Sequence, residues 1–269
     1  MKNVTLQNDW PETWKSSHPY DLMEIYQGKM HPGYTYAYVN RREHTLGLIR
    51  QIAETGATVL DVAAAQGNFS LSLAEVGYEV TWNDLRAELA DYVKLKYEHG
   101  ILHFAPGNVF DLNIEVKFDI VLITEIIEHV AHPDEFLCKI SQLVKPGGHI
   151  VMTTPNGQYI RNDLPKFSEC ADPSQFEGQQ FKPNADGHIF LLHLDEIESL
   201  AQRANLRVKE ISIFTNPLTN GHLKLEPLLK ILPIAVVNSI ERMTNSLPMR
   251  LRSKLCTGMA VLFQKPHSL

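Results

Sequence analysis

The chain has 269 residues, of which 44% are hydrophobic and 21% are charged, and its net charge is −6. These values are typical of a folded domain and argue against a general nucleic-acid binder, which needs a positive surface to displace counterions from phosphates. The three widely spaced cysteines, Cys138, Cys170 and Cys256, indicate neither a disulfide framework nor a zinc site. Because there is no basic-then-apolar leader and no apolar run of about 18 residues, we expect a cytoplasmic protein.

Aromatic residues crowd the first 38 positions, which we expect to form an irregular arm. An apolar stripe at helical spacing then predicts a helix from about residue 40 to 55, ended by Gly56. After it, short apolar runs alternate with helical patterns. The expected strands are 58–62, 79–82, 101–105, 118–123 and 149–154, and the expected helices are 68–76, 85–99 and 133–144. This order predicts an α/β fold with a parallel sheet covered by helices on both faces.

Two insertions interrupt this alternation. Residues 155–192 are rich in proline and glycine, and residues 216–256 are rich in leucine, isoleucine and proline. A helix at 194–204 and a strand at 208–214 lie between them, and a last strand at 259–264 closes the chain. Long loops of this kind are usually functional, so we expect both insertions to form a cap over a substrate. We therefore divide the chain into an arm at 1–55 and a catalytic domain at 56–269.

The second insertion and the tail differ in charge from the rest of the chain. From Asn216 onward seven basic residues face two acidic ones, so this part carries +5 and the remainder −11. Such a segment could contact anionic substrates or lipid headgroups, which keeps peripheral membrane contact through 216–256 open. The ordinary alternative is a helical cap whose charged side chains face water.

A turn of small residues follows the first expected strand, which ends at Asp61. Ala63, Ala65 and Gly67 occupy this turn, and the next helix begins directly after it. Small residues let backbone N–H groups approach a ligand, and ligands of open parallel sheets lie beyond the carboxyl ends of the strands. A nucleotide-type ligand fits this turn. We predict a negative φ at both alanines, because alanine reaches positive φ only with strain.

Polar residues also follow the second and third strands. Asp84 lies about twenty residues after the turn, where an acid can accept hydrogen bonds from a ribose diol. Alternatively, Asp84 is the N-cap of a helix that starts at Leu85. Asn108 could bond the edge of an adenine while Val109 lies on its face, or the two could form an ordinary turn.

These motifs, in this order, resemble the class I S-adenosylmethionine-dependent methyltransferases, in particular the branch of the ubiquinone-pathway O-methyltransferases. The resemblance covers about residues 57–215. It rests on Val59–Ser70, Asp84, Gly107–Asn108, Phe118–Val130 and the Leu-Val-Lys-Pro-Gly-Gly turn that begins at Leu143. It implies a Rossmann-like three-layer sandwich whose mostly parallel seven-stranded sheet has an antiparallel last strand. The chain departs from the family in its turn, where Ala63 and Ala65 replace two of three usual glycines.

The resemblance implies S-adenosyl-L-methionine as the cofactor. By analogy with the family, Asp61 would meet the methionine amine or an ordered water, and Thr124 and Glu125 would face the methionine moiety. Arg41 or Arg42 would meet the cofactor carboxylate, unless both are solvated. The full set of expected cofactor contacts is Asp61, Ala63, Ala65, Gly67, Asp84, Leu85, Asn108, Val109, Thr124 and Arg41.

Glu125, Glu128 and His129 would lie on one face of a helix, because they are three and four residues apart. With His188 as a fourth ligand they could bind Mg²⁺ or Mn²⁺. They resemble the metal set of small-RNA terminal 2′-O-methyltransferases and some quinone-pathway relatives, although many metal-free members carry a similar run. Without a metal, His129 or His188 is the candidate general base, and Glu125 is grouped with them as catalytic.

We therefore expect an O-methyltransferase that acts on a hydroxyl of a small polar or cyclic acceptor, such as a phenol, enol, cyclitol or sugar, with or without a metal. One alternative acceptor is a lipid or quinone precursor at a membrane surface. Another is the terminal ribose of an RNA, which the acidic body disfavours. A nicotinamide-dependent oxidoreductase is argued against by the missing Gly-x-Gly-x-x-Gly motif. A non-catalytic cofactor-binding module is a further, minor alternative.

Overall fold

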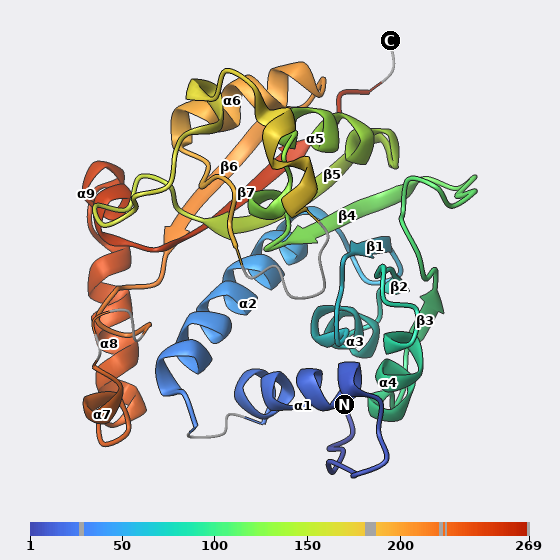
Figure 1. The fold of residues 1–269 in the computed structure, drawn as a ribbon, viewed down its shortest axis with the longest axis horizontal. Helices are drawn as coiled ribbons and strands as arrows, with labels where there is room; N and C mark the ends of the chain where they lie inside the picture. Colours follow the sequence, from blue (N-terminus) through green and yellow to red (C-terminus); the bar gives the residue numbers. More distant parts are fainter. Residues whose placement is uncertain (27–29, 181–186, 221–222, 224, 268–269) are drawn as a thin grey trace.

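The fold is known from a computed structural model, which describes residues 1–26, 30–180, 187–220, 223 and 225–267 (Figure 1). Its centre is a seven-stranded sheet with the order β3-β2-β1-β4-β5-β7-β6. The strands are β1 Thr58–Val62, β2 Glu79–Trp82, β3 Ile101–Phe104, β4 Phe118–Thr124, β5 Val144–Pro155, β6 Arg207–Phe214 and β7 Gly258–Gln264. Strand β7 runs antiparallel to both of its neighbours, β5 and β6, while β1 to β5 pair in parallel. The predicted sheet, including its antiparallel last strand, is confirmed.

Helices cover both faces of this sheet. They are α1 Glu12–Glu24, α2 Pro32–Ile52, α3 Asn68–Glu75, α4 Leu89–Lys96, α5 Pro133–Gln142, α6 Leu194–Arg203, α7 Glu226–Leu229, α8 Ile234–Asn245 and α9 Met249–Leu255. In β4, Val121 and Ile123 pack into the core under α5 and α6. The alternate residues Ile120 and Leu122 pack on the other side, under α2 and α3. Because successive side chains of a strand point to opposite faces, β4 joins both cores and produces the predicted three layers.

The first 38 residues are not irregular, so that prediction is wrong. The arm contains α1, and α2 begins at Pro32 rather than near residue 40. Proline at the first helical turn costs no hydrogen bond, which suits Pro32 to this start. The Trp10 and Trp14 rings pack against the Tyr92 ring of α4. Helix α1 is therefore stabilised by contacts with a distant element, which a local pattern does not reveal.

Two further element boundaries differ from the prediction. Helix α4 begins at Leu89, four residues after the predicted start at Leu85. The predicted turn at 145–148 lies inside β5, where the pairing shifts between Phe118–Val144 and Ile120–His149. An irregularity of this kind inserts extra residues on one strand, so the Lys-Pro-Gly-Gly sequence forms a bulge within β5 instead of a turn before the strand.

The second insertion contains α7, α8 and α9, which stand as a column at one side of the sheet (Figure 1). Residues 221, 222 and 224 of this insertion, and 181–186 of the first, lie outside the described residues. Among the helices that are described, none combines the length and the apolarity that crossing a bilayer requires.

A buried ion pair holds α1 against the rest of the fold. The Lys96 ammonium donates to Asp21 Oδ1 and to Asn68 Oδ1, at 2.8 Å each. The Lys96 and Asp21 side chains are 1% and 0% exposed. Tyr92 donates a second hydrogen bond to the Asp21 carboxylate, at 2.6 Å. This network joins α1, α3 and α4, so α1 is fixed in place by desolvated polar contacts.

Replacing Lys96 by methionine should lower the free energy of unfolding by about 3–5 kcal/mol, because Asp21 would stay buried without its cation. Urea unfolding followed by circular dichroism measures this loss. The matched control is Lys94→Met, two residues away, whose 2.7 Å pair with Asp91 is more than half exposed. That change should cost at most about 1 kcal/mol. Equal losses in the two variants would contradict the structural role of the buried pair.

Candidate cofactor and catalytic site

The carboxyl ends of three parallel strands meet at one edge of the sheet. Asp61 in β1 pairs in register with Trp82 of β2 on one side and Leu122 of β4 on the other. Asp84 is the second residue after β2, and Thr124 is the last residue of β4. Because β1 lies between β2 and β4, the chain order reverses at this point, where ligands of open α/β sheets bind. The structure thus brings together three of the predicted cofactor contacts.

Asp61 presents an unpaired oxygen at this edge. Its side chain is buried, and its Oδ2 accepts a 2.5 Å hydrogen bond from Ser70 Oγ. Its Oδ1 has no hydrogen-bond partner among the described residues. Burial raises the pKa of Asp61 to about 7, although hydrogen bonds from Ser70 oppose the shift. An unmade buried hydrogen bond is costly, so Asp61 suits a ligand that brings a donor or a positive charge.

The turn after β1 has left-handed backbone at all three predicted small residues. The φ angles are 55° at Ala63, 48° at Ala65 and 73° at Gly67. The prediction of negative φ at the two alanines is therefore wrong, although the turn lies where it was predicted, between β1 and α3. An alanine in this region costs roughly 1–2 kcal/mol. At Gly67 a Cβ would also lie 2.8 Å from Val93 Cγ2, so space as well as φ requires glycine there.

Hydrogen bonds with the end of β2 and the two residues after it hold the turn in this strained form. Ala64 N donates to Asn83 O at 2.8 Å, and Ala65 N donates to Asp84 Oδ2 at 2.8 Å. Ala65 O accepts from the Trp82 indole at 3.0 Å. Strained backbone persists where the surroundings determine it in this way, and it concentrates at binding sites. The turn is thus preorganised by β2 and by Asp84.

Asp84 serves the turn rather than the helix. Helix α4 begins at Leu89 and its N-cap position is Glu88, so the N-cap alternative for Asp84 is wrong. Its Oδ1 accepts from the backbone N and from the Nε of Arg86, at 2.9 Å each. The Arg86 side chain is 39% exposed, so it could swing into solvent and leave a carboxylate oxygen for a ribose diol. The side chain of Leu85, beside it, is exposed.

Asn108 bonds its own turn in this structure. Its Oδ1 accepts from Phe110 N at 3.2 Å, and its Nδ2 donates to Asp111 Oδ2 at 2.9 Å. This arrangement is the ordinary turn that was the alternative to adenine binding. Val109 is buried behind it. An adenine contact by Asn108 stays a prediction.

The run from Glu125 to His129 is not a helix, so that prediction is wrong. A single 3₁₀ turn, η1, spans Ile127–His129, and Glu125 precedes it with a φ of 51°. The cause is the sheet, because Glu125 N donates to Thr153 O at 2.9 Å and continues the pairing of β4 with β5. The Glu125 carboxylate instead forms an ion pair with Arg41, with Oε2 2.7 Å from Nη1.

Glu128, His129 and His188 form a compact cluster. One ligand atom from each lies within 4.8 Å of the others. Glu128 is buried; its Oε2 accepts from Thr154 Oγ1 at 3.0 Å, and no described residue bonds its Oε1. Burial, and secondly the nearby Glu125, raise the pKa of Glu128 well above its usual range. Burial, followed by the neighbouring His129, lowers the pKa of His188.

This cluster fits a divalent cation. Two imidazoles and a carboxylate form a donor set that binds such ions, and a cation would give the unpaired Glu128 oxygen a partner. Of the four predicted ligands, the structure brings three together and places Glu125 outside the cluster, paired with Arg41. Arg42 lies elsewhere and donates to Ser72 Oγ at 3.3 Å.

Glu24 of α1 is a residue at this edge that the sequence did not indicate. Its carboxylate accepts hydrogen bonds from Tyr34 and Asn68, at 2.7 Å each, and from Gln66 at 3.0 Å. Burial raises the pKa of Glu24. Gln66 and Asn68 flank Gly67, so α1 reaches the turn that β1 enters. No spacing pattern links residues so far apart, and only the fold reveals the contact.

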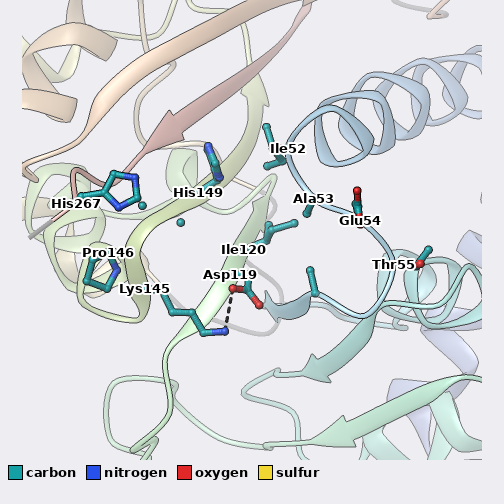
Figure 2. A pocket seen from close by; sticks show the side chains of 13 residues that line it. Ile52, Ala53, Glu54, Thr55, Asp119, Ile120, Lys145, Pro146, His149 and His267 are labelled. Carbon is teal, nitrogen blue, oxygen red and sulfur yellow. Dashed lines mark hydrogen bonds and ion pairs between the residues drawn. The ribbon is translucent and has the colours of Figure 1, made fainter.

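A separate pocket lies at the opposite edge of the sheet (Figure 2). Its volume is about 460 Å³, and its lining includes the start of β4 and the bulge of β5. Lys145 Nζ and Asp119 Oδ1, 2.9 Å apart, form an ion pair in its lining, and His149 and His267 line it as well (Figure 2). Ligands of open α/β sheets bind at the carboxyl ends of the strands, so this amino-end pocket is not the candidate catalytic site.

Comparisons with known proteins show the family to which this fold belongs. A family model described as a methyltransferase domain matches residues 36–211. The chain is 32% identical over 170 residues to a ubiquinone biosynthesis O-methyltransferase of Proteus mirabilis (strain HI4320), covering 61% of this chain and 67% of the relative. A relative of the same name from Coxiella burnetii (strain Dugway 5J108-111) is 30% identical over 190 residues, covering 64% and 73%.

A solved structure supports the fold. The S-adenosylmethionine-dependent methyltransferase from Mesorhizobium loti superposes with a TM-score of 0.55, covering 83% of this chain and 98% of that one. Its sequence is 14% identical to this chain, so this likeness concerns the fold only.

Replacing Ala65 by glycine should raise the free energy of unfolding by about 0.5–1 kcal/mol, because relief of the left-handed strain exceeds the added chain entropy of glycine. Urea unfolding measures this gain. Ala64→Gly is the control in the same turn, because Ala64 is not among the residues with positive φ. That change should lower the stability by a similar amount, and a loss in both variants would contradict the strain at Ala65.

Proposed function

We propose that this chain, which belongs to the class I S-adenosylmethionine-dependent methyltransferases, transfers the methyl group to a hydroxyl oxygen of a small polar or cyclic acceptor. Phenols, enols, cyclitols and sugars are acceptors of this kind. The observation that carries the proposal is the cluster of Glu128, His129 and His188 beside the carboxyl end of β4. Such groups can withdraw the proton of a hydroxyl, or hold a cation that acidifies it. The O-methyltransferase names of the curated relatives also favour oxygen as the acceptor atom.

The residues at the carboxyl ends of β1 and β2 would bind the cofactor, whose sulfonium supplies an already activated methyl group. Asp61 would accept a hydrogen bond from the methionine ammonium through its unpaired Oδ1. Asp84 would accept the ribose hydroxyls once Arg86 turns outward. The exposed Leu85 side chain would cover the adenine on the same side. In-line transfer then depends mainly on positioning, which the preorganised turn provides.

The chemical work of the protein is the removal of one proton from the acceptor. Mg²⁺ or Mn²⁺, if held by Glu128, His129 and His188, would lower the pKa of a coordinated hydroxyl. Without a metal, His129 or His188 would accept the proton directly. In both arrangements Glu125 acts through Arg41, which it keeps at the edge of the site. Arg41 can still meet the cofactor carboxylate, because its Nε is unbonded by any residue that the structure describes.

A quinone or lipid precursor is the second candidate acceptor. It is favoured by the relatives named ubiquinone biosynthesis O-methyltransferase. The exposed apolar side chains of the α7–α9 column also favour it, because they suit an acceptor with a long apolar tail. A terminal RNA ribose is less favoured, since the net charge of −6 repels a polyanion.

Chelator-treated protein and metal-replete protein distinguish the two ways to remove the proton. The assay measures transfer of a tritiated methyl group from the cofactor to each member of a panel of phenols, cyclitols, sugars and quinone precursors. Only tritium that stays in the product after treatment with base is counted, because a methyl ether is stable to base. If a metal acts, adding Mg²⁺ or Mn²⁺ to the chelator-treated protein should raise kcat at least tenfold. His188→Ala should abolish this response to metal. Equal rates with and without metal would leave a histidine as the base.

The control for His188→Ala is His132→Ala, because His132 pairs with Glu177 outside the cluster. That variant should keep its activity and its metal response. Label found only on nitrogen, or in ribonuclease-sensitive material, would contradict the proposed acceptor. Tight binding of NAD without binding of S-adenosylhomocysteine would contradict the cofactor.

The affinity for S-adenosylhomocysteine should depend on pH through Asp61. Its pKa is raised to about 7, so the carboxyl is protonated below that pH and cannot pair with the ligand ammonium. Affinity should therefore rise up to about tenfold per unit between pH 5 and 7, and level off above. Calorimetry measures this slope. It should vanish in Asp61→Asn and persist in Asp91→Asn, which alters an exposed carboxylate of α4.

A further inference from the structure

The α7–α9 column exposes an unusual amount of apolar surface. Eight of the eighteen large apolar side chains that are exposed among the described residues lie between positions 226 and 255. Single exposed apolar residues are normal on a protein surface, but a concentration of this kind marks an interaction site. The eight are Leu228, Ile231, Ile234, Val236, Met243, Met249, Leu251 and Leu255.

Helix α8 buries mainly polar residues and exposes apolar ones, the opposite of an ordinary amphipathic surface helix. Its buried residues are Val237, Glu241 and Thr244, two of which are polar. The Glu241 carboxylate accepts hydrogen bonds from Asn216 N and from the Thr219 hydroxyl, which fixes the polar side of the helix inward. Val236 and Met243, seven residues apart, are therefore held outward. A helix that faces water places its apolar side chains inward, so the outer face of α8 is suited to an apolar medium.

Basic side chains accompany the exposed apolar ones. Residues 226–255 contain five basic and two acidic residues, a net charge of +3, whereas the whole chain carries −6. Lys230, Arg242, Arg250 and Lys254 are exposed. Of the two acids, Glu241 is buried and its carboxylate is hydrogen-bonded. Apolar side chains among basic ones are the surface by which helices bind anionic bilayers.

From the exposed apolar side chains and the basic charge of residues 226–255, we propose that the α7–α9 column docks the protein on the surface of an anionic phospholipid bilayer. A second copy of the chain is a poorer occupant, because pairing two such columns would bring like charges together. The acidic remainder of the protein would be repelled by the same surface, which orients the column toward it.

Docking would place the site next to the bilayer. Asn156, which follows β5, donates through Nδ2 to Ser253 O and Cys256 O, at 2.7 Å each, and Ile160 N donates to Lys254 O at 3.0 Å. These bonds fix α9 to the carboxyl edge of the sheet, where the proposed cofactor-binding and catalytic residues lie. The proposal does not depend on the identity of the acceptor, because it concerns the surface itself.

Cosedimentation of the full chain with vesicles tests the docking. The wild type should bind vesicles of phosphatidylcholine with phosphatidylglycerol much more tightly than vesicles of phosphatidylcholine only. Lys230→Gln with Arg250→Gln should weaken anionic binding by about fivefold for each charge removed. The matched control, Lys117→Gln with Lys209→Gln, removes two exposed charges that lie outside residues 226–255, and should bind as the wild type does.

The apolar contribution has its own pair of variants. Ile231→Ser with Met243→Ser, at side chains 77% and 72% exposed, should weaken binding at least about tenfold. The control pair Ile101→Ser with Val116→Ser, at 55% and 65% exposed, should leave binding unchanged. Because all four residues are exposed, urea unfolding should show similar stability throughout.

Three results would overturn the proposal. The first is equal binding of the wild type to both kinds of vesicle, and the second is an equal loss in the column and control pairs. The third is a lipid-free dimer in sedimentation equilibrium that Ile231→Ser with Met243→Ser dissociates, which would assign the surface to a second copy. None of these results depends on methyl transfer, so the proposed function stands or fails separately.

Discussion

The parallel pairing of β1 with β2 and β4 is the constraint on which the site depends. Parallel strands place their carboxyl ends on one edge, and the register that sets Asp61 beside Trp82 and Leu122 aligns the three strand ends. The strained turn, Asp84 and the cluster after β4 therefore lie at the same edge of the sheet, because each follows the carboxyl end of one of these strands. The apolar, fully buried interior of β4 maintains this pairing, because both faces of the strand lose contact with water.

Backbone strain concentrates at this edge. Five residues other than glycine have positive φ in the described part of the chain, and three of them are Ala63, Ala65 and Glu125. The turn is held by Asp84 and Trp82, and Glu125 by its bond to β5 and its pair with Arg41. Strain that neighbours maintain is a form of preorganisation, since the backbone does not have to rearrange when a ligand arrives.

The N-terminal helices complete the site from a distance. The buried pair of Lys96 with Asp21 fixes α1, and this in turn places Glu24 against Gln66 and Asn68 beside the turn. Arg41 of α2 reaches Glu125 on the other side. On the side of β5, Asn156 ties α9 to the same edge. The region predicted as an irregular arm is therefore an integral part of the site, and the second insertion adjoins it.

The sequence by itself determined the order of strands and helices of the sheet, which follows from apolar periodicity, and the convergence of Asp61 and Asp84, which follows from the rule that parallel strands share an edge. Its resemblance to the methyltransferase family implied the seven-stranded sheet and the place of Thr124. Only the tertiary structure decided the left-handed alanines, the pairing of Glu125 with Arg41 and the contact of Glu24 with the turn. Each of these depends on groups far apart in the chain, whose hydrogen bonds and ion pairs outweigh local preference. The same reason separates the cluster of Glu128, His129 and His188 from the helix that their spacing predicted: sheet pairing of Glu125 prevents the helix from starting there.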